Sequence, residues 1–273
     1  MSNINKKKCK EPLLRLAEMN SGASYYNTDL RSMDTDFKSF CRSNKIDFKQ
    51  ANEIGINKSK DLLIRYFRDQ NDGNISKEEC ENLYRLLKDP WDNSKLERHK
   101  LLASYINLLR LEKDMLFRKI LILGAGTGGE YENLRKIYPM VKYIITDISE
   151  NALKSYKLKY NGNNSYTTQV LDTFCIKSLS SFSNSHGKFD LIIASGVYRY
   201  APSRQNKYNS AEFIYKNLLE HNGLFCIAEV SQDPEHDDPF ILRRLTPILN
   251  KEVQTKMRIN PTQFVFYEKG WNN

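Results

Sequence analysis

Ten residues near the middle of the chain restrict the possible fold most strongly. Residues 120–129 read ILILGAGTGG, an unbroken apolar run that ends in a cluster of four glycines. The apolar run predicts a buried strand and the glycines predict a tight loop. Glycine adopts turns that other residues resist, and without a Cβ it lets a ligand approach the backbone N–H groups. Residues 130–137 are predicted to form a helix whose free N–H groups face the loop, so we expect a nucleotide or nucleoside there.

An acidic residue follows at the end of the next predicted strand. The β-rich run over residues 142–146 ends at Asp147. A carboxylate in this position can accept hydrogen bonds from two ribose hydroxyls. The glycine spacing fits both the G-x-G-x-x-G pattern of dinucleotide sites and a G-x-G-x-G pattern, so a dinucleotide-dependent oxidoreductase stays open at this point.

The second half of the chain alternates between predicted helices and strands. In order, the pattern predicts a helix over 150–160, a strand over 166–171, a serine-rich linker over 178–185, a strand over 189–196, a helix over 211–220, a strand over 224–230 and a helix near 240–249. Residues 252–259 and 263–267 read as an antiparallel strand pair. The predicted fold is α/β, a doubly wound sheet that is mostly parallel and ends in an antiparallel pair.

The first part of the chain has helical periodicity instead. It predicts four or five helices, with starts at two capping boxes, Ser76 to Glu79 and Ser94 to Glu97. An apolar stripe within residues 101–116 is expected to pack against the sheet. We therefore divide the chain into a disordered start over 1–10, an all-helical lid or substrate-recognition segment over 11–117, and the sheet domain over 118–273.

Residues 68–79 resemble a calcium-binding EF-hand loop. Gly73 stands at the obligatory glycine position, but Arg68 and Gln70 stand where the first and third ligands are needed. Because an arginine would place a cation beside the metal, we interpret the segment as a turn between two helices and expect no metal.

Composition limits the environment of the protein. The 40% apolar and 27% charged content is that of a water-soluble chain, and no run approaches the roughly 20 apolar residues of a membrane span. Residues 1–10 lack the apolar core of a secretory signal. The five cysteines are scattered, which favours a reducing, cytoplasmic location over disulfides or a zinc site. The net charge of +9 is spread evenly, so we interpret it as solvated lysine rather than a nucleic-acid surface.

From about residue 118 to the end, these motifs together resemble the class I, Rossmann-like S-adenosylmethionine-dependent methyltransferases. The resemblance rests on the glycine loop, on Asp147, on the run from Phe189 to Gly196, on residues 218–225 before the fifth strand, and on the final strand pair. It implies S-adenosyl-L-methionine as cofactor. It also implies that the cofactor-binding residues are Gly124, Ala125, Gly126, Gly128, Asp147, Ile148, Asp172, Thr173 and Ser195.

One position departs from the family pattern. The residue two before Gly124 is often acidic in this family, where it helps to hold the cofactor's amino group, and here it is Ile122. The methionine end must then be held by other groups, and Glu130 and backbone carbonyls are candidates. A site that has lost its activity stays an alternative.

Methyl transfer from a sulfonium depends mainly on alignment, and a base is needed only for a neutral acceptor. The catalytic candidates follow the fourth and fifth strands, at the edge where such sheets bind ligands: Glu229, Tyr198 and His236. Glu229 is the most suspect because a carboxylate within an apolar strand is costly without a purpose. Asp190 is interpreted as structural.

The expected reaction is transfer of a methyl group to an oxygen or nitrogen of a small-molecule metabolite. RNA or protein substrates, a non-catalytic binding module and an NAD(P)-dependent oxidoreductase on the same glycine loop are the alternatives. No membrane partner is expected, and the helical segment is hypothesised to close over the substrate.

Overall fold

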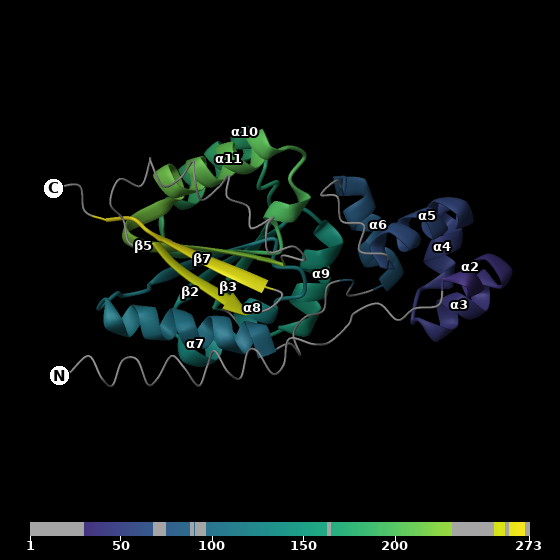
Figure 1. Cartoon of the computed structure of the whole chain (residues 1–273), viewed down its shortest axis with the longest axis horizontal. Coiled ribbons are helices and arrows are strands. Elements are labelled where there is room, and N and C mark those ends of the chain that lie inside the picture. Colours follow the sequence, from purple (N-terminus) through teal and green to yellow (C-terminus); the bar gives the residue numbers. More distant parts are fainter. Residues whose placement is uncertain are drawn as a thin grey trace.

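The computed structural model describes residues 30–67, 75–87, 90, 97–162, 165–230, 254–259 and 262–270 (Figure 1). Its helices are α2 (Arg31–Thr35), α3 (Phe37–Ser43), α4 (Phe48–Ile54), α5 (Ile56–Phe67), α6 (Lys77–Leu87), α7 (Glu97–Glu112), α8 (Gly129–Ile137), α9 (Glu150–Lys159), α10 (Ile176–His186) and α11 (Arg204–Phe213), with short turns η1 (Tyr198–Tyr200) and η2 (Ile214–Leu218). Its strands are β1 (Lys119–Leu123), β2 (Lys142–Asp147), β3 (Tyr166–Val170), β4 (Phe189–Ser195), β5 (Leu219–Val230), β6 (Gln254–Ile259) and β7 (Thr262–Glu268).

The seven described strands form one sheet in the order β3-β2-β1-β4-β5-β7-β6. Strands β1 to β5 are parallel, whereas β7 pairs antiparallel with both β5 and β6. This confirms the predicted doubly wound sheet with its antiparallel C-terminal pair. Because β1 has β2 on one side and β4 on the other, the connections diverge there, and such a switch point is where open sheets bind ligands.

Strand β1 is buried on both faces. Ile120 and Ile122 belong to one core, with α7, α8 and α9, and Leu121 and Leu123 belong to the other, with α10 and α11. Successive side chains of a strand point to opposite faces, so an unbroken apolar run is what a strand between two helical layers requires. Figure 1 shows α7 and α8 on one side of the sheet and α10 and α11 on the other.

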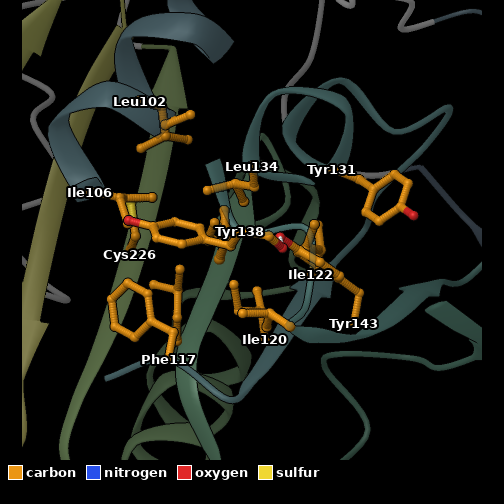
Figure 2. Close-up of a cluster of buried hydrophobic side chains, with 14 of the residues drawn as sticks. Leu102, Ile106, Phe117, Ile120, Ile122, Tyr131, Leu134, Tyr138, Tyr143 and Cys226 are labelled. Carbon is orange, nitrogen blue, oxygen red and sulfur yellow. Dashed lines mark hydrogen bonds between the residues drawn. The ribbon is translucent and has the colours of Figure 1, made fainter. Parts of the chain in front are cut away.

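Figure 2 shows how α7 is fixed to the sheet. Leu102 and Ile106 of α7 lie in the same cluster as Ile120 and Ile122 of β1. The ring of Tyr138 lies edge-on to that of Phe117, and its hydroxyl donates to Asn107 Oδ1 of α7 at 3.1 Å. The predicted packing of the apolar stripe against the sheet is confirmed.

Helices α2 to α6 form a separate core. Its buried residues include Met33, Phe40, Ile46, Leu63 and Leu83. At the start of α6, the predicted capping box is confirmed: Glu79 N donates to Ser76 Oγ at 3.2 Å, and Ser76 N donates to Glu79 Oε2 at 2.9 Å. We call this group, residues 30–67 and 75–87, the helical unit.

Because the core of the helical unit is separate from the cores of the sheet, a cavity in the helical unit should leave the sheet intact. We expect Leu63→Ala, at a fully buried position, to destabilise the helical unit by about 2–5 kcal/mol. Amide hydrogen exchange should then accelerate in α3 to α6 and stay unchanged in β1 and β4. Leu121→Ala, equally buried in the sheet, is the matched control, and it should accelerate exchange in the strands. Equal acceleration everywhere in both variants would contradict two separate cores.

The serine-rich linker predicted over 178–185 is wrong, because these residues lie within helix α10. Leu179 and Phe182, three residues apart, are buried against the sheet, and Gly187 ends the helix at a φ of +66°. Serine has only a modest cost in a helix, so burial of one apolar face outweighs it.

The boundaries predicted around the fifth strand are also wrong. Helix α11 begins at Arg204, where Ser203 Oγ accepts from Asn206 N at 3.1 Å, and it continues through the wider turn η2 to Leu218. Strand β5 begins at Leu219, and Asn222, with a φ of +61°, lies within it at a shift in pairing register. The Asn-Gly pair therefore forms a bulge and not the end of a helix.

Four predictions lie outside the described residues: the disordered start over 1–10, the loop over 68–74, Ser94 of the second capping box, and the helix near 240–249. Within the described part of the chain, none of the helices is both long enough and apolar enough to cross a membrane.

Candidate active site

The glycine loop connects β1 to α8 through left-handed backbone. Gly126 has a φ of +51° and Gly128 one of +88°, values that residues with a Cβ rarely adopt. Ala125 N donates to Thr146 O at 2.9 Å, which ties the loop to the end of β2. Helix α8 starts directly after Gly128, so its free N–H groups lie at the carboxyl edge of the sheet.

Asp147 is hydrogen-bonded to this loop. Its Oδ2 accepts from Gly126 N at 2.9 Å and its Oδ1 from Ser149 N at 2.9 Å, and the residue is only 5% exposed. Burial raises the pKa of the carboxyl to about 6, while the two backbone hydrogen bonds oppose the rise and the charge of Glu81 adds to it. Each oxygen keeps a further lone pair, so the carboxylate is oriented and can still accept from a ligand.

Close packing explains why residue 128 is a glycine. A Cβ on Gly128 would overlap the ring of Tyr156, and the hydroxyl of Tyr160 donates to Gly128 O at 3.0 Å. Tyr156 of α9 and Tyr160, its C-cap residue, thus fix the start of α8 and leave no room for a side chain at residue 128.

The residues predicted beside β3 lie next to Asp147. Leu171 N donates to Asp147 O at 2.9 Å, so the chain leaving β3 runs along the end of β2. Asp172 Oδ1 accepts from Phe174 N at 2.9 Å, which makes a local turn. Thr173 is buried and its carbonyl accepts from Ser210 Oγ at 2.7 Å.

Ser195 lies at the end of β4, across the switch point from the glycine loop. Val197 follows it, and a Cβ on Gly124 would lie 2.5 Å from Val197 Cγ2. The loops after β1 and β4 are therefore in contact. Together, Gly124, Ala125, Gly126, Asp147, Ile148, Asp172, Thr173 and Ser195 all lie along one edge of the sheet.

A buried pair of titratable residues follows the loop. Glu130 Oε1 on α8 lies 3.1 Å from His99 Nδ1 on α7, and both side chains are at least nine-tenths buried. The charge of Glu130 adds to the effect of burial in raising the pKa of Cys226. Ile122, Ile193 and Cys226 form one row across the sheet, so the carboxylate of Glu130 lies near the face to which Ile122 points.

Tyr198 is fully buried in the core beneath η1. Its ring packs edge-on to Phe174, and its hydroxyl lies 3.2 Å from Ser210 Oγ. This environment is structural and disfavours the predicted catalytic role. Glu229 lies on β5 opposite Gln263 of β7, but its side chain is outside the described part of the structure, as is the whole of His236. Of the three catalytic candidates, Tyr198 is thus the one whose side chain the structure describes.

Asp190 has the structural role that we predicted. Its Oδ2 accepts from Arg118 N and Lys119 N, both at 2.8 Å, at the opposite edge of the sheet.

Sequence reasoning missed the contribution of α6. A Cβ on Gly126 would lie 2.9 Å from the hydroxyl of Tyr84, so this ring reaches the glycine loop. Cys80 and Tyr84 form a small cluster with Ile148 and Ala152. The four-residue spacing of Cys80 and Tyr84 marks one helix face, but no local signal indicates what that face covers.

Residues 121–225 match the family model described as a methyltransferase domain. Among curated proteins, the chain is similar to the non-reducing polyketide synthase mapC of Penicillium roqueforti, at 29% identity over 122 residues, 42% of this chain and 5% of that protein. It is also similar to the non-reducing polyketide synthase ausA of Penicillium brasilianum, at 27% identity over 156 residues, 54% of this chain and 6% of that protein. The chain thus spans about one-twentieth of the length of these relatives.

Among solved structures, the CurJ carbon methyltransferase matches at 13% identity, with a TM-score of 0.51 over 99% of this chain and 94% of that one. Human N-acetylserotonin methyltransferase matches at 13% identity over 78% of this chain and 68% of that one, with a TM-score of 0.47. The first likeness extends over the helical unit as well as the sheet and shows a shared fold. Residues 121–225 thus match a methyltransferase domain, and the order of the strands and the hydrogen-bonded glycine loop are those of the Rossmann-like fold of class I, S-adenosylmethionine-dependent methyltransferases.

Proposed function

We propose that this chain transfers a methyl group from S-adenosyl-L-methionine to a small molecule. The observation that carries the proposal is the hydrogen bond from Gly126 N to Asp147 Oδ2 at the switch point of the sheet. It joins a loop, in which Gly126 has no Cβ to hold a ligand away, to a carboxylate whose remaining lone pairs suit ribose hydroxyls. When bound, the cofactor supplies an electrophilic methyl group on a sulfonium.

At the nucleoside end, Asp147 would accept from the ribose, and Ile148, Asp172 and Thr173 would hold the adenine. Asp172 is engaged in its own turn, so backbone groups at this position are better placed than its carboxylate to bind. The donors and acceptors present at this edge fit a nucleoside.

At the methionine end, we propose that Glu130 binds the amino group of the cofactor, because Ile122 has no carboxylate to do so. The carboxylate lies directly after the glycine loop, 3.1 Å from His99 Nδ1. Its position in the first turn of α8 stabilises the negative charge through the helix dipole. A buried carboxylate there can attract the ammonium of the cofactor.

Glu130→Gln is therefore expected to weaken S-adenosylhomocysteine binding by about tenfold, the scale of one hydrogen bond to a charged group. The amide keeps the shape of the side chain and removes its charge. Calorimetric titration checks this, with adenosine as the matched ligand because it has no amino-acid end. An equal loss for both ligands would remove Glu130 from the methionine end.

The protein contributes mainly alignment to an in-line displacement. A neutral acceptor also needs a base, and Glu229 remains our candidate because β5 carries it to the carboxyl edge of the sheet. Tyr198 is not proposed, since its hydroxyl is buried.

The acceptor atom has two candidates. An oxygen or nitrogen nucleophile follows from the earlier expectation for a small metabolite. A carbon nucleophile is the second, favoured by the similarity to polyketide synthases and to a carbon methyltransferase. Because the positive charge is spread evenly along the sequence, we favour either small-molecule acceptor over RNA.

Two measurements test this function. Calorimetric titration should detect S-adenosylhomocysteine binding and none of a nicotinamide dinucleotide, whereas the reverse would favour an oxidoreductase. Transfer of labelled methyl should then be assayed on hydroxyl and amine metabolites, on an acetoacetyl thioester as a carbon acceptor, and on RNA and protein fractions. Label in RNA or protein alone would contradict a small-molecule acceptor, and cofactor binding without any transfer would favour a binding module.

The domain division is part of the proposal. The packing of α7 in the core of the sheet favours a boundary before α7, so that the helical unit alone is the separate segment.

A further inference from the structure

Helix α6 belongs to two cores at once. Leu83 and Leu86 are buried in the core of the helical unit, whereas Cys80 and Tyr84 pack with Ile148 and Ala152 at the carboxyl edge of the sheet. Figure 1 shows α6 between α9 and the rest of the helical unit. Among the described residues, one face of α6 therefore attaches the helical unit to this edge.

Glu81 fastens that face to the start of α9. Its carboxylate accepts from Ser149 Oγ at 2.9 Å, Glu150 N at 2.6 Å, Asn151 N at 3.2 Å and Asn151 Nδ2 at 2.7 Å. The first N–H groups of a helix have no partner within it and attract negative charge, so a carboxylate from another helix can cap them. These hydrogen bonds hold α6 where it is.

In this position α6 covers the groups that would bind a nucleoside. The hydroxyl of Tyr84 lies over Gly126. The charge of Glu81 adds to the effect of burial in raising the pKa of Asp147, and burial together with the charges of Asp147 and Glu81 raises the pKa of Cys80. Asp147 is 5% exposed. A ligand above Gly126 would therefore meet the hydroxyl of Tyr84, and α6 must move away to make room for it.

We propose that α6 is a gate for the cofactor, closed in this structure and latched by the hydrogen bonds of Glu81 to the start of α9. The inference rests on the proposed function, since it assigns the covered edge to S-adenosylmethionine. It differs from a lid that closes over substrate, because the closed gate competes with the cofactor. The helical unit moves with α6, since Leu83 and Leu86 are part of its core.

Because the closed gate competes with the cofactor, opening the gate should increase the affinity for the cofactor. When only the open fraction binds, the apparent dissociation constant is the intrinsic one divided by that fraction. Glu81→Ala removes the latch, so S-adenosylhomocysteine should bind about three- to tenfold more tightly and associate faster by the same factor, with an unchanged dissociation rate. Stopped-flow fluorescence measures both rates. Weaker binding would show that α6 completes the site, and unchanged rates would show that it does not restrict access; each result overturns the proposal.

Glu78→Ala is the matched control. Glu78 lies on the same helix, is exposed, and pairs with Lys58 of α5 at 2.6 Å within the helical unit. Its loss removes an ion pair but no contact with α9, so the association rate should stay that of the wild type.

A reversible lock tests the gate without weakening the fold. Ala152→Cys places a thiol in the same cluster as the native Cys80. Oxidation should join α6 to α9 and abolish S-adenosylhomocysteine binding, and reduction should restore it. Cys80→Ser in the same background should make binding insensitive to oxidation. Failure of the thiols to join would contradict the packing of α6 on α9.

Different results would contradict the gate and the assignment of the cofactor. Binding that is the same in the locked and the reduced protein overturns the gate alone. No binding by wild type, by Glu81→Ala or by the reduced protein contradicts the cofactor assignment itself.

Discussion

Gly126→Val is expected to reduce the affinity for S-adenosylhomocysteine on the order of 100-fold or more. The φ of Gly126 is +51°, and a branched side chain in such backbone costs about 1–3 kcal/mol. The new side chain would also stand between the ligand and the N–H group that now donates to Asp147. Calorimetric titration, with circular dichroism to confirm folding, measures the loss.

Gly187→Val separates backbone strain from obstruction of the site. Gly187 has a similar φ of +66°, a Cβ there meets nothing within 4 Å, and it lies before β4 at the opposite edge of the sheet. This variant should lose stability and keep its affinity. If both variants bind equally well, the glycine loop does not face the cofactor.

Asp147→Ala is expected to weaken cofactor binding by about 1–3 kcal/mol, the cost of leaving sugar hydroxyls without a charged acceptor in a buried place. S-adenosylhomocysteine and adenosine should be affected alike, in contrast to Glu130→Gln. Asp190→Ala is the matched control, since Asp190 also accepts from two backbone N–H groups but at the far edge. An unchanged affinity of Asp147→Ala would remove Asp147 from the site.

The same carboxyl group should make stability depend on pH. Burial raises the pKa of Asp147 from 3.8 to about 6, so the folded protein keeps this proton to a higher pH than the unfolded chain does. The resulting contribution to the free energy of unfolding is fully present below about pH 4 and is lost as the pH rises through about 6. Urea unfolding at a series of pH values should show this loss in the wild type and not in Asp147→Asn. A parallel loss in both proteins would assign it to other groups.

Local pattern was sufficient for the central part of this protein. The apolar run before the glycines fixes β1 as a strand buried on both faces, and the left-handed φ values of Gly126 and Gly128 explain why glycine stands there. The position of Asp147 at the end of β2 follows from the same alternation. These features depend on neighbours in the chain, which is why the sequence alone predicts them.

Local pattern was misleading where distant contacts decide. The serines of α10 read as a linker, but burial of Leu179 and Phe182 against the sheet makes them helical. Tyr198 follows β4 as a catalytic side chain would, yet its ring turns into the core. Propensity is a weak preference, and tertiary burial overrides it.

The sequence by itself determined the class of fold, the glycine loop and the acid beside it, because each is set by period, turn chemistry and chain order. Only the tertiary structure decided what surrounds them. Glu81 and the residues that it caps at the start of α9 are nearly 70 positions apart, as are Tyr84 and Ala152. Glu130 of α8 lies beside His99 of α7. No periodicity encodes such pairs, since they arise only when the helical unit and α7 pack on the sheet and bring separate side chains to one edge.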